Sequence, residues 1–283
     1  MLTKQDFHIS NSNESIIVQQ KGEVPFLTFS KLLRAGVVHG FSTRLGGVSE
    51  GHLSSMNLSF SRGDEEENVR ENYRRIGEAI GVKPEQMVGS DQQHHTTVRR
   101  VTVADRGKGI IRECDYADVD GLVTNDKGVC LVTFYADCIP LFFYDPVQRA
   151  IGLSHSGWRG TVNRMGEKTV QKMNQEFGSK PEDIIAAVGP GICRACYEVS
   201  RDVYEEFASC FTEEECGLIF DKKENDKFQL DLWKANELVL LSAGIRKDKL
   251  DITDICTCCN EKLLFSHRAS KGLRGNLAGF LML

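Results

Sequence analysis

The sequence has no apolar run approaching the roughly 20 residues that a membrane-spanning helix needs, so we expect no membrane association. Its N-terminus also lacks the apolar core of a signal peptide, which predicts a cytoplasmic protein with reduced thiols. Basic residues total 35 against 40 acidic ones, a net charge of -5, so no basic field is available to attract nucleic acid. An anionic small substrate would need arginines gathered at one site.

The chain also lacks repeats, low-complexity tracts and any recognisable linker. Its 283 residues fit one large domain or two small ones, and 41% hydrophobic residues are ample for a core. Strand-like and helix-like segments interleave without a strict βαβ alternation. We therefore predict a single α/β domain over residues 1–283, with a mixed β-sheet core flanked by helices and a peripheral segment over residues 1–35. The sequence does not indicate an oligomeric state.

Cysteine, by contrast, is abundant, with ten residues. A disulfide framework is not expected without an export signal, so metal ligation or plain burial gains weight. Two groups stand out, C-x-x-C at Cys193–Cys196 and C-x-C-C at Cys256–Cys259. They lie much further apart than the 15–20 residues that separate the pairs of a zinc ribbon. We therefore favour thiols near one another in the core or near a pocket over a second, structural zinc.

Chemistry-bearing residues gather in one stretch of the chain, YADCIPLFFYDPVQRAIGLSHSGWRGT. Two predicted strands there are joined by a turn at Asp145-Pro146, and antiparallel pairing would bring Cys138 and His155 to one end of the sheet. A third candidate ligand, His94 or His95, lies in the polar break DQQHHTTV. One His–Cys–His set suits Zn²⁺ and leaves a fourth position open, as in catalytic sites. Taken alone, a cysteine in a strand or a histidine at a strand end is more often simply a buried structural residue.

Three charged residues accompany this set. Asp137 precedes the cysteine and is a candidate orienting group, general base or turn cap. Arg44 and Arg159 each lie in a glycine-rich turn, where a guanidinium can bind phosphate or make a surface ion pair.

The chain resembles the laccase-domain family, also called the YfiH/YlmD family, over roughly residues 36–280. The matching segments, in chain order, are VVHGFSTRLGGVS, MNLSF, DQQHHTTV, DGLVTN, ADCIPLFFYDP, SHSGWRGT, VGPGICRACYEV and CTCC with FSHR. Members of this family are described as polyphenol oxidases or purine nucleoside phosphorylases. The resemblance implies a fold similar to the catalytic domain of the cytotoxic necrotising factors.

The resemblance also implies site residues. The family's zinc-binding His–Cys–His triplet falls on His94, Cys138 and His155, with Gln92 matching a motif glutamine. His95 stands where the family usually has glycine, which leaves the choice between the two neighbouring rings open. Arg268 matches a pocket arginine, whereas the family's T-G-R segment is altered at Arg274. We predict catalytic roles for Asp137 and Arg159, and substrate-binding roles for Arg44, Gln92 and Arg268.

The activity implied by the resemblance is phosphorolysis of adenosine, inosine, guanosine and S-methyl-5'-thioadenosine, together with deamination of adenosine. Zn²⁺ is the expected cofactor, with Cu²⁺ as the alternative, and the expected partners are purine nucleosides and phosphate. Two other enzymes remain open: a cysteine hydrolase or deamidase using a Cys138–His155 dyad, and a copper-dependent phenol oxidase. The latter is disfavoured because a multicopper oxidase needs many more than seven histidines. A non-enzymatic binding role is also open.

Overall fold

A computed structural model describes residues 1–283, and its strands form two six-stranded sheets and one three-stranded sheet. The first sheet has the order β1-β2-β3-β15-β7-β4. Its strands are β1 (Ile16–Lys21), β2 (Val24–Phe29), β3 (Val38–Ser42), β15 (Leu277–Met282), β7 (Cys130–Tyr135) and β4 (Met87–Gly89). All neighbours are antiparallel except β4 and β7, so the sheet is mixed.

The second sheet has the order β14-β10-β8-β9-β6-β5. Its strands are β14 (Leu250–Ile252), β10 (Ile185–Val188), β8 (Ile139–Asp145), β9 (Ala150–Ser156), β6 (Gly121–Thr124) and β5 (Val98–Arg100). The central pair, β8 and β9, is the antiparallel hairpin that the sequence predicts, and the two edge pairs are parallel.

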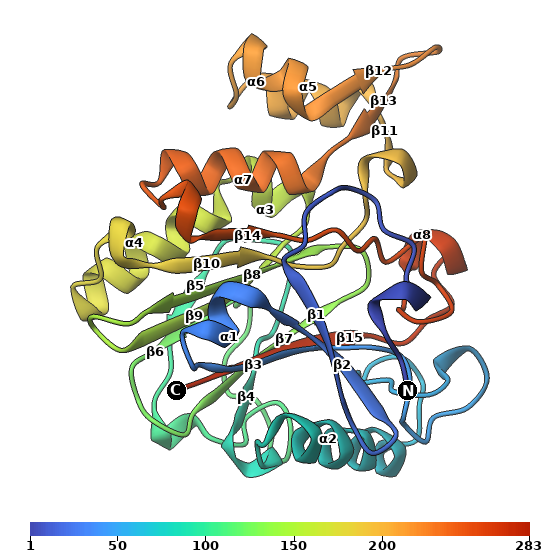
Figure 1. Ribbon diagram of the computed structural model, residues 1–283, viewed down its shortest axis with the longest axis vertical. Coiled ribbons are helices and arrows are strands. Elements are labelled where there is room, and N and C mark those ends of the chain that lie inside the picture. The colour runs from blue at the N-terminus through green and yellow to red at the C-terminus, as the bar shows by residue number, and fades with distance from the viewer.

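Helices cover the outer faces of this pair of sheets (Figure 1). Helix α2 packs against β2 and β3 of the first sheet, and α4 and α7 pack on the side of the second sheet. The helices are α1 (Ser30–Arg34), α2 (Glu66–Ile80), α3 (Trp158–Val162), α4 (Met165–Phe177), α5 (Arg201–Ala208), α6 (Glu213–Ile219), α7 (Leu232–Ser242) and α8 (His267–Ser270). None of them is long and apolar enough to cross a bilayer.

Apolar runs such as IPLFFYD are nearly continuous because both faces of these strands are buried. Successive side chains point to opposite faces of a strand. In β8, Phe142 packs between the two sheets, whereas Leu141 and Phe143 pack toward α4 and α7. In β7, Leu131 packs between the sheets and Val132 packs toward α2. Both faces of both sheets are therefore buried, and the layers run helix, sheet, sheet, helix.

The predicted α/β class with a mixed core and flanking helices is confirmed, but the strands form two packed sheets where one was expected. Residues 1–35 differ more from expectation, because β1 and β2 form the edge of the first sheet. Leu27, Phe29 and Leu32 have no exposed surface, so this segment is part of the core.

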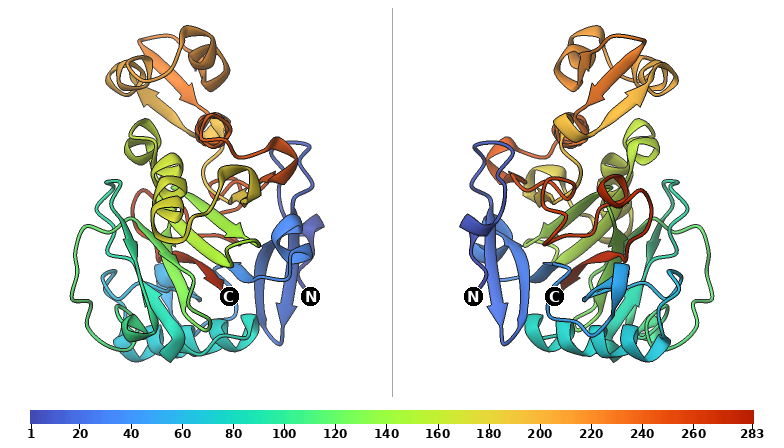
Figure 2. Two further views of the ribbon diagram at one scale, coloured as in Figure 1. Left: turned by 90° about the vertical axis from the view of Figure 1, so that its left-hand side faces the viewer. Right: turned by 90° about the vertical axis from the view of Figure 1, so that its right-hand side faces the viewer.

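A smaller element group projects from the top of the molecule in Figure 1 and in both side views of Figure 2. It contains the three-stranded sheet β11-β13-β12, with helices α5 and α6 beside it. The strands are β11 (Glu198–Ser200), β12 (Phe220–Lys222) and β13 (Lys227–Leu230). Tyr204 of α5 stacks on Phe228 with ring centroids 4.4 Å apart, so the group has an aromatic core that is continuous with the packing around α7.

Candidate active site

Three metal-ligating side chains from separate parts of the chain meet at one end of the second sheet. The ligand atoms of His94, Cys138 and His155 all lie within 4.8 Å of one another. The β8–β9 register places Pro140 opposite His155, so Cys138, two residues before Pro140, lies beside the end of β9. The predicted convergence of the cysteine and the histidine at the end of the hairpin is therefore confirmed.

The structure distinguishes the two neighbouring histidines. His94 has a left-handed backbone (φ 64°), and its ring meets that of His155 edge-on with centroids 4.9 Å apart. His95 turns away, and its exposed Nδ1 lies 2.7 Å from a carboxylate oxygen of Asp118. Only His94 joins the cluster with Cys138 and His155.

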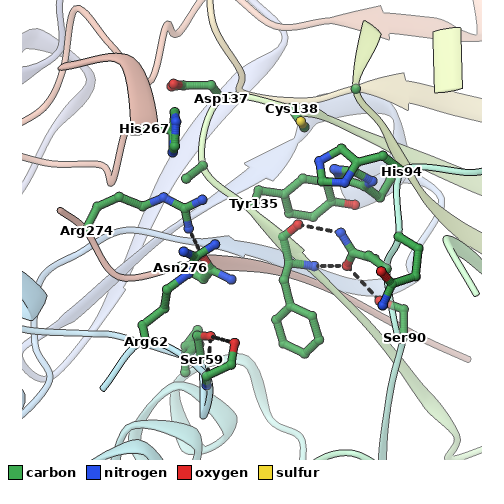
Figure 3. Close-up of a pocket in the computed structure, with 18 of the residues that line it drawn as sticks. Ser59, Arg62, Ser90, His94, Tyr135, Asp137, Cys138, His267, Arg274 and Asn276 are labelled. Atoms are coloured by element: carbon green, nitrogen blue, oxygen red, sulfur yellow. Dashed lines mark hydrogen bonds between the residues drawn. The ribbon is translucent and has the colours of Figure 1, made fainter. Parts of the chain in front are cut away.

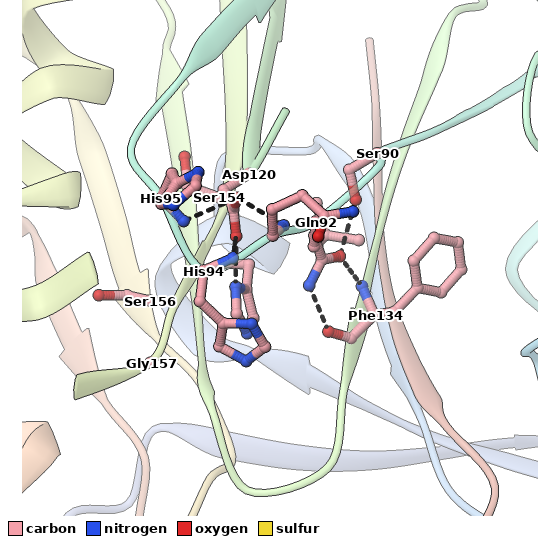
Figure 4. Close-up of polar contacts among 12 residues, drawn as sticks. Ser90, Gln92, His94, His95, Asp120, Phe134, Ser154, Ser156 and Gly157 are labelled. Atoms are coloured by element: carbon pink, nitrogen blue, oxygen red, sulfur yellow. Dashed lines mark hydrogen bonds and ion pairs between the residues drawn. The ribbon is translucent and has the colours of Figure 1, made fainter. Parts of the chain in front are cut away.

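One buried carboxylate, Asp120, contacts both the ring of His155 and the backbone of His94 (Figure 4). It lies 2.8 Å from Nδ1 of His155, which leaves Nε2 of that ring to face the cluster. It also accepts the backbone N–H groups of Gln93, His94 and His95 at 3.0–3.1 Å. Sequence analysis missed Asp120, because an aspartate at the start of the strand in DGLVTN reads as an ordinary turn residue.

The charges in this cluster shift its ionisation. Burial raises the pKa of the Cys138 thiol, but the charge of His155 and hydrogen bonds from both imidazoles outweigh it, and the pKa falls to about 6. Burial lowers the pKa of His155, yet Cys138 and Asp120 together raise it to about 9. Burial also acts on Asp120, but its contacts with His155 and the backbone N–H groups hold its pKa below the usual range. A thiolate beside a cationic imidazole is thus favoured in the absence of a metal.

The donor set fits a single ion such as Zn²⁺, since thiolate and imidazole are its preferred ligands. Gly157 leaves the necessary space. A Cβ atom at that position would lie 3.0 Å from Sγ of Cys138 and 3.3 Å from Cδ2 of His94. The orienting contact from Asp120 to His155 is the kind of partner that ligating histidines in metal sites nearly always have.

The cluster opens into a cavity of about 800 Å³. Its lining carries four arginines, Arg62, Arg159, Arg268 and Arg274, against two carboxylates, Asp91 and Asp137. Arg62 and Arg274 lie close together beside Asn276 (Figure 3). Burial and the charge of Arg62 lower the pKa of Arg274 to about 10, and its Nε has no hydrogen-bond partner in the protein. This concentration of positive charge in a protein of net charge -5 favours an anionic ligand.

Two of the predicted substrate-binding residues line this cavity. Gln92 uses its amide to brace β7, exchanging hydrogen bonds with the backbone N–H and C=O of Phe134 at 2.6 and 2.9 Å. Arg268 donates to the carbonyl oxygens of Cys196 and Glu198, both at 3.1 Å. Both side chains therefore hold the walls of the cavity in place.

The two residues with predicted catalytic roles also line the cavity. Arg159 is exposed, packs over the ring of Trp158 at 4.2 Å, and has no carboxylate within ion-pair distance. Asp137 accepts hydrogen bonds from Thr257 Oγ1 at 2.6 Å and from the backbone N–H of Arg268 at 2.7 Å. Asp137 therefore positions the loops around the cavity, and the carboxylate that orients a histidine of the cluster is Asp120.

Arg44 is not where we expected it. Its guanidinium donates to the carbonyl oxygens of Ser54 and Glu261, both at 2.8 Å, and packs over Phe265. It lies outside the lining of the main cavity, because these loop contacts hold it elsewhere. Arg274, which sequence analysis ranked below Arg268, lines the main cavity together with Arg268.

Known proteins are similar to this chain in sequence over most of its length. Residues 38–283 match the sequence model of the family described as "Multi-copper polyphenol oxidoreductase laccase". The chain is 36% identical over 247 residues to the protein named purine nucleoside phosphorylase YlmD of Bacillus subtilis, covering 87% of this chain and 88% of that one.

Two solved structures share the fold. YlmD from Geobacillus stearothermophilus has a TM-score of 0.87 at 33% identity, and the Bacillus licheniformis hypothetical protein YfiH has a TM-score of 0.88 at 30% identity. Each comparison covers 94% of this chain and 98% of the other. With the sequence match extending over most of its length, the chain belongs to the laccase-like family of polyphenol oxidoreductases and YlmD-type purine nucleoside phosphorylases.

Proposed function

We propose that this protein is a zinc-dependent purine nucleoside phosphorylase that accepts adenosine, inosine, guanosine and S-methyl-5'-thioadenosine and also deaminates adenosine. The observation that carries the proposal is the His94–Cys138–His155 cluster at a cavity large enough for a nucleoside and phosphate, with arginines on its walls. Curated relatives named purine nucleoside phosphorylase support the same substrate class.

His94, Cys138 and His155 are the residues that would hold the ion. When bound, Zn²⁺ supplies Lewis-acid polarisation of a fourth ligand. The protein contributes the fixed geometry: Asp120 sets the ring of His155 and the backbone of His94, and Gly157 keeps the space beside the sulfur open. These contacts exist before substrate arrives, so little reorganisation is needed on binding.

Phosphorolysis needs phosphate held against the sugar. A phosphate oxygen forms a bond to C1′ of the ribose as the bond from C1′ to the base breaks, and the base leaves with that electron pair and takes up a proton. Arg159 and Arg274 are the groups we assign to the phosphate, since a guanidinium offers paired donors to its oxygens. Both arginines lie in the lining of the cavity, and Arg159 has no competing carboxylate.

A matched pair of histidine variants tests the metal dependence. We expect His94→Ala to lose the zinc ion of this site and the conversion of adenosine plus phosphate to adenine and ribose 1-phosphate, because that ion loses one of its three protein ligands. His95→Ala is the control, since this exposed side chain contacts only Asp118. The measurements are zinc and copper per chain by elemental analysis and product separation by chromatography. Equal loss in both variants, or full activity in His94→Ala, would refute the proposal.

The finer activities have their own readouts. Inosine formed from adenosine without phosphate reports deamination, and the free base released from inosine, guanosine or S-methyl-5'-thioadenosine with phosphate reports the range of phosphorolysis. We expect all of these to depend on the same cluster. If deamination survives His94→Ala, that reaction does not take place at the proposed site.

The second candidate is a cysteine hydrolase or deamidase. The observation that favours it is the lowered pKa of Cys138, about 6, beside the imidazole of His155, which is the arrangement of an activated thiol nucleophile. The two candidates differ in their response to metal removal. A chelator abolishes a zinc-dependent activity and spares a thiol-dependent one. Alkylation of Cys138 in the chelated protein then stops the thiol-dependent activity that remains.

A further inference from the structure

A second cluster of potential ligands lies outside the His94–Cys138–His155 site. The sulfur atoms of Cys193, Cys196, Cys256 and Cys259 all lie within 4.8 Å of one another. Two of the separations are 3.9 Å, from Cys193 to Cys259, and 3.4 Å, from Cys196 to Cys259. Four sulfurs arranged tetrahedrally at about 2.3 Å from a zinc ion would be about 3.8 Å apart. The cysteine cluster thus has the size of a four-thiolate zinc site.

The backbone around the cluster favours thiolates. Sγ of Cys256 accepts the backbone N–H of Cys193 at 3.2 Å and that of Cys259 at 3.4 Å. Such donors stabilise a negatively charged sulfur and fix the sulfur relative to both loops. Cys193 and Cys256 are buried and none of the four sulfurs is in a disulfide, so all four remain available as ligands.

The structure also resolves the sequence pattern. Cys256 and Cys259 belong to the cluster and the intervening Cys258 does not, so the second group reads C-x-x-C, like Cys193–Cys196. Cys193 and Cys256 are 63 positions apart in the chain, and the parallel pair β10 and β14 brings their loops together. Thiols near one another is what we expected from the sequence, but two facing C-x-x-C pairs are the ligand arrangement of structural zinc.

We propose that Cys193, Cys196, Cys256 and Cys259 bind one structural Zn²⁺ ion that is distinct from the ion of the His94–Cys138–His155 site. Four protein ligands leave no open position, so this site has no direct catalytic role.

The ion would join two loops that support the cavity. Thr257, inside the second C-x-x-C pair, donates to Asp137, and the backbone N–H of Ile192 donates to the carbonyl oxygen of Asp137 at 2.9 Å. Arg268 is anchored to the carbonyl oxygen of Cys196. Ile192, Asp137 and Arg268 all line the cavity. Metal binding at the cysteine cluster would therefore stabilise the fold and the cavity wall together.

The test removes the first site and asks what metal remains. A His94→Ala/His155→Ala double variant of the full chain, purified without added metal or chelator, is expected to contain one zinc per chain by elemental analysis. Loading it with Co²⁺ in place of zinc should give the intense sulfur-to-cobalt charge-transfer absorption of a thiolate-rich site. Adding Cys196→Ser and Cys259→Ser to this background should abolish both signals. The matched control is Cys258→Ser, in the same loop, which should keep both.

Loss of metal through misfolding is separated by a measurement on the unaltered chain. A strong chelator should make the four thiols reactive toward a thiol reagent and lower the urea midpoint, and zinc should reverse both. The proposal is overturned by a double variant that holds no metal and gives no cobalt–thiolate absorption, by equal loss of metal in Cys258→Ser, or by a disulfide among the four cysteines in freshly isolated protein. None of these readouts depends on enzymatic activity, so the fate of the proposed function does not affect them.

Discussion

Asp120 concentrates more contacts of the candidate site than any residue that directly faces the cavity. Its carboxylate fixes a ring nitrogen of His155 and three consecutive backbone N–H groups around His94. Removing a carboxylate partner of a ligating histidine typically weakens metal binding by about 10- to 100-fold.

We therefore expect Asp120→Asn to bind zinc about 10- to 100-fold more weakly than the unaltered chain. The side-chain NH₂ of asparagine is a donor, and the groups around residue 120 are N–H donors that need an acceptor. Competition against a zinc-binding dye measures this affinity. Asp118→Asn is the control, because its carboxylate contacts the exposed His95 only. An unchanged affinity in Asp120→Asn would contradict the role assigned to this side chain.

The space beside the sulfur gives a second prediction. A methyl group at Gly157 would approach Cys138 and His94 within 3.0 and 3.3 Å, whereas at Gly160 the nearest atom is 3.6 Å away. Overpacking typically costs 1–3 kcal/mol, so Gly157→Ala should weaken zinc binding by about tenfold or more. Gly160→Ala should leave it unchanged in the same titration. If the two variants bind zinc equally, the close approach at Gly157 is not a requirement of the site.

At the scale of elements, the buried amide of Asn72 joins helix α2 to the loop that follows β3. Asn72 accepts the backbone N–H of Val48 at 2.9 Å and donates to Ser49 and to the carbonyl oxygen of Asn57, both at 2.8 Å. The outer face of the same helix carries the ion pairs of Arg74 with Glu71 and Glu78.

Asn72→Ala should lower the free energy of unfolding by roughly 2–4 kcal/mol, because it leaves a buried N–H and a buried C=O without partners. Arg74→Ala, on the exposed face, should change it little, since surface ion pairs contribute weakly. Urea denaturation followed by circular dichroism compares the two. A loss no larger for Asn72→Ala than for Arg74→Ala would show that the amide network is dispensable.

Elements set by local pattern could be predicted from the sequence, and contacts between distant segments could not. The β8–β9 hairpin followed from two apolar runs around Asp145-Pro146, and it carried the correct placement of Cys138 and His155. The division into two sheets, and the inclusion of residues 1–35 in one of them, depend on which strands pair over long distances. Sequence spacing also hid the meeting of the two C-x-x-C pairs.

Side-chain roles were predictable only where chemistry restricts them. A cysteine and histidines suit few purposes at a strand end, whereas an arginine in a glycine-rich turn is chemically compatible with many. The position of Arg44 outside the main cavity could not be predicted for this reason, because its backbone-carbonyl partners come from loops that no local pattern connects.

At the scale of the whole molecule, charge is distributed unevenly. The protein is acidic overall, yet the cavity beside the His94–Cys138–His155 cluster gathers four arginines. We expect Arg274→Ala to raise the KM for phosphate about tenfold or more, in line with the loss of a charged hydrogen bond, with a smaller change in the KM for nucleoside.

Arg44→Ala is the matched control for this measurement, because Arg44 lies outside the cavity lining and should leave the KM for phosphate unchanged. Steady-state kinetics with phosphate and nucleoside varied separately distinguishes the two effects. A rise in the nucleoside KM alone would place the anion elsewhere in the cavity.

The position of Arg268 has a consequence for how the molecule moves. Its guanidinium grips the chain at Cys196 and Glu198, where the projecting β11–β13 group begins, while its own backbone N–H is held by Asp137. Tyr197 and Leu232, at the two ends of that group, also line the cavity. A displacement of the projecting group relative to the two large sheets would therefore lengthen these hydrogen bonds. It would also move Tyr197 and Leu232, and so change the shape of the cavity.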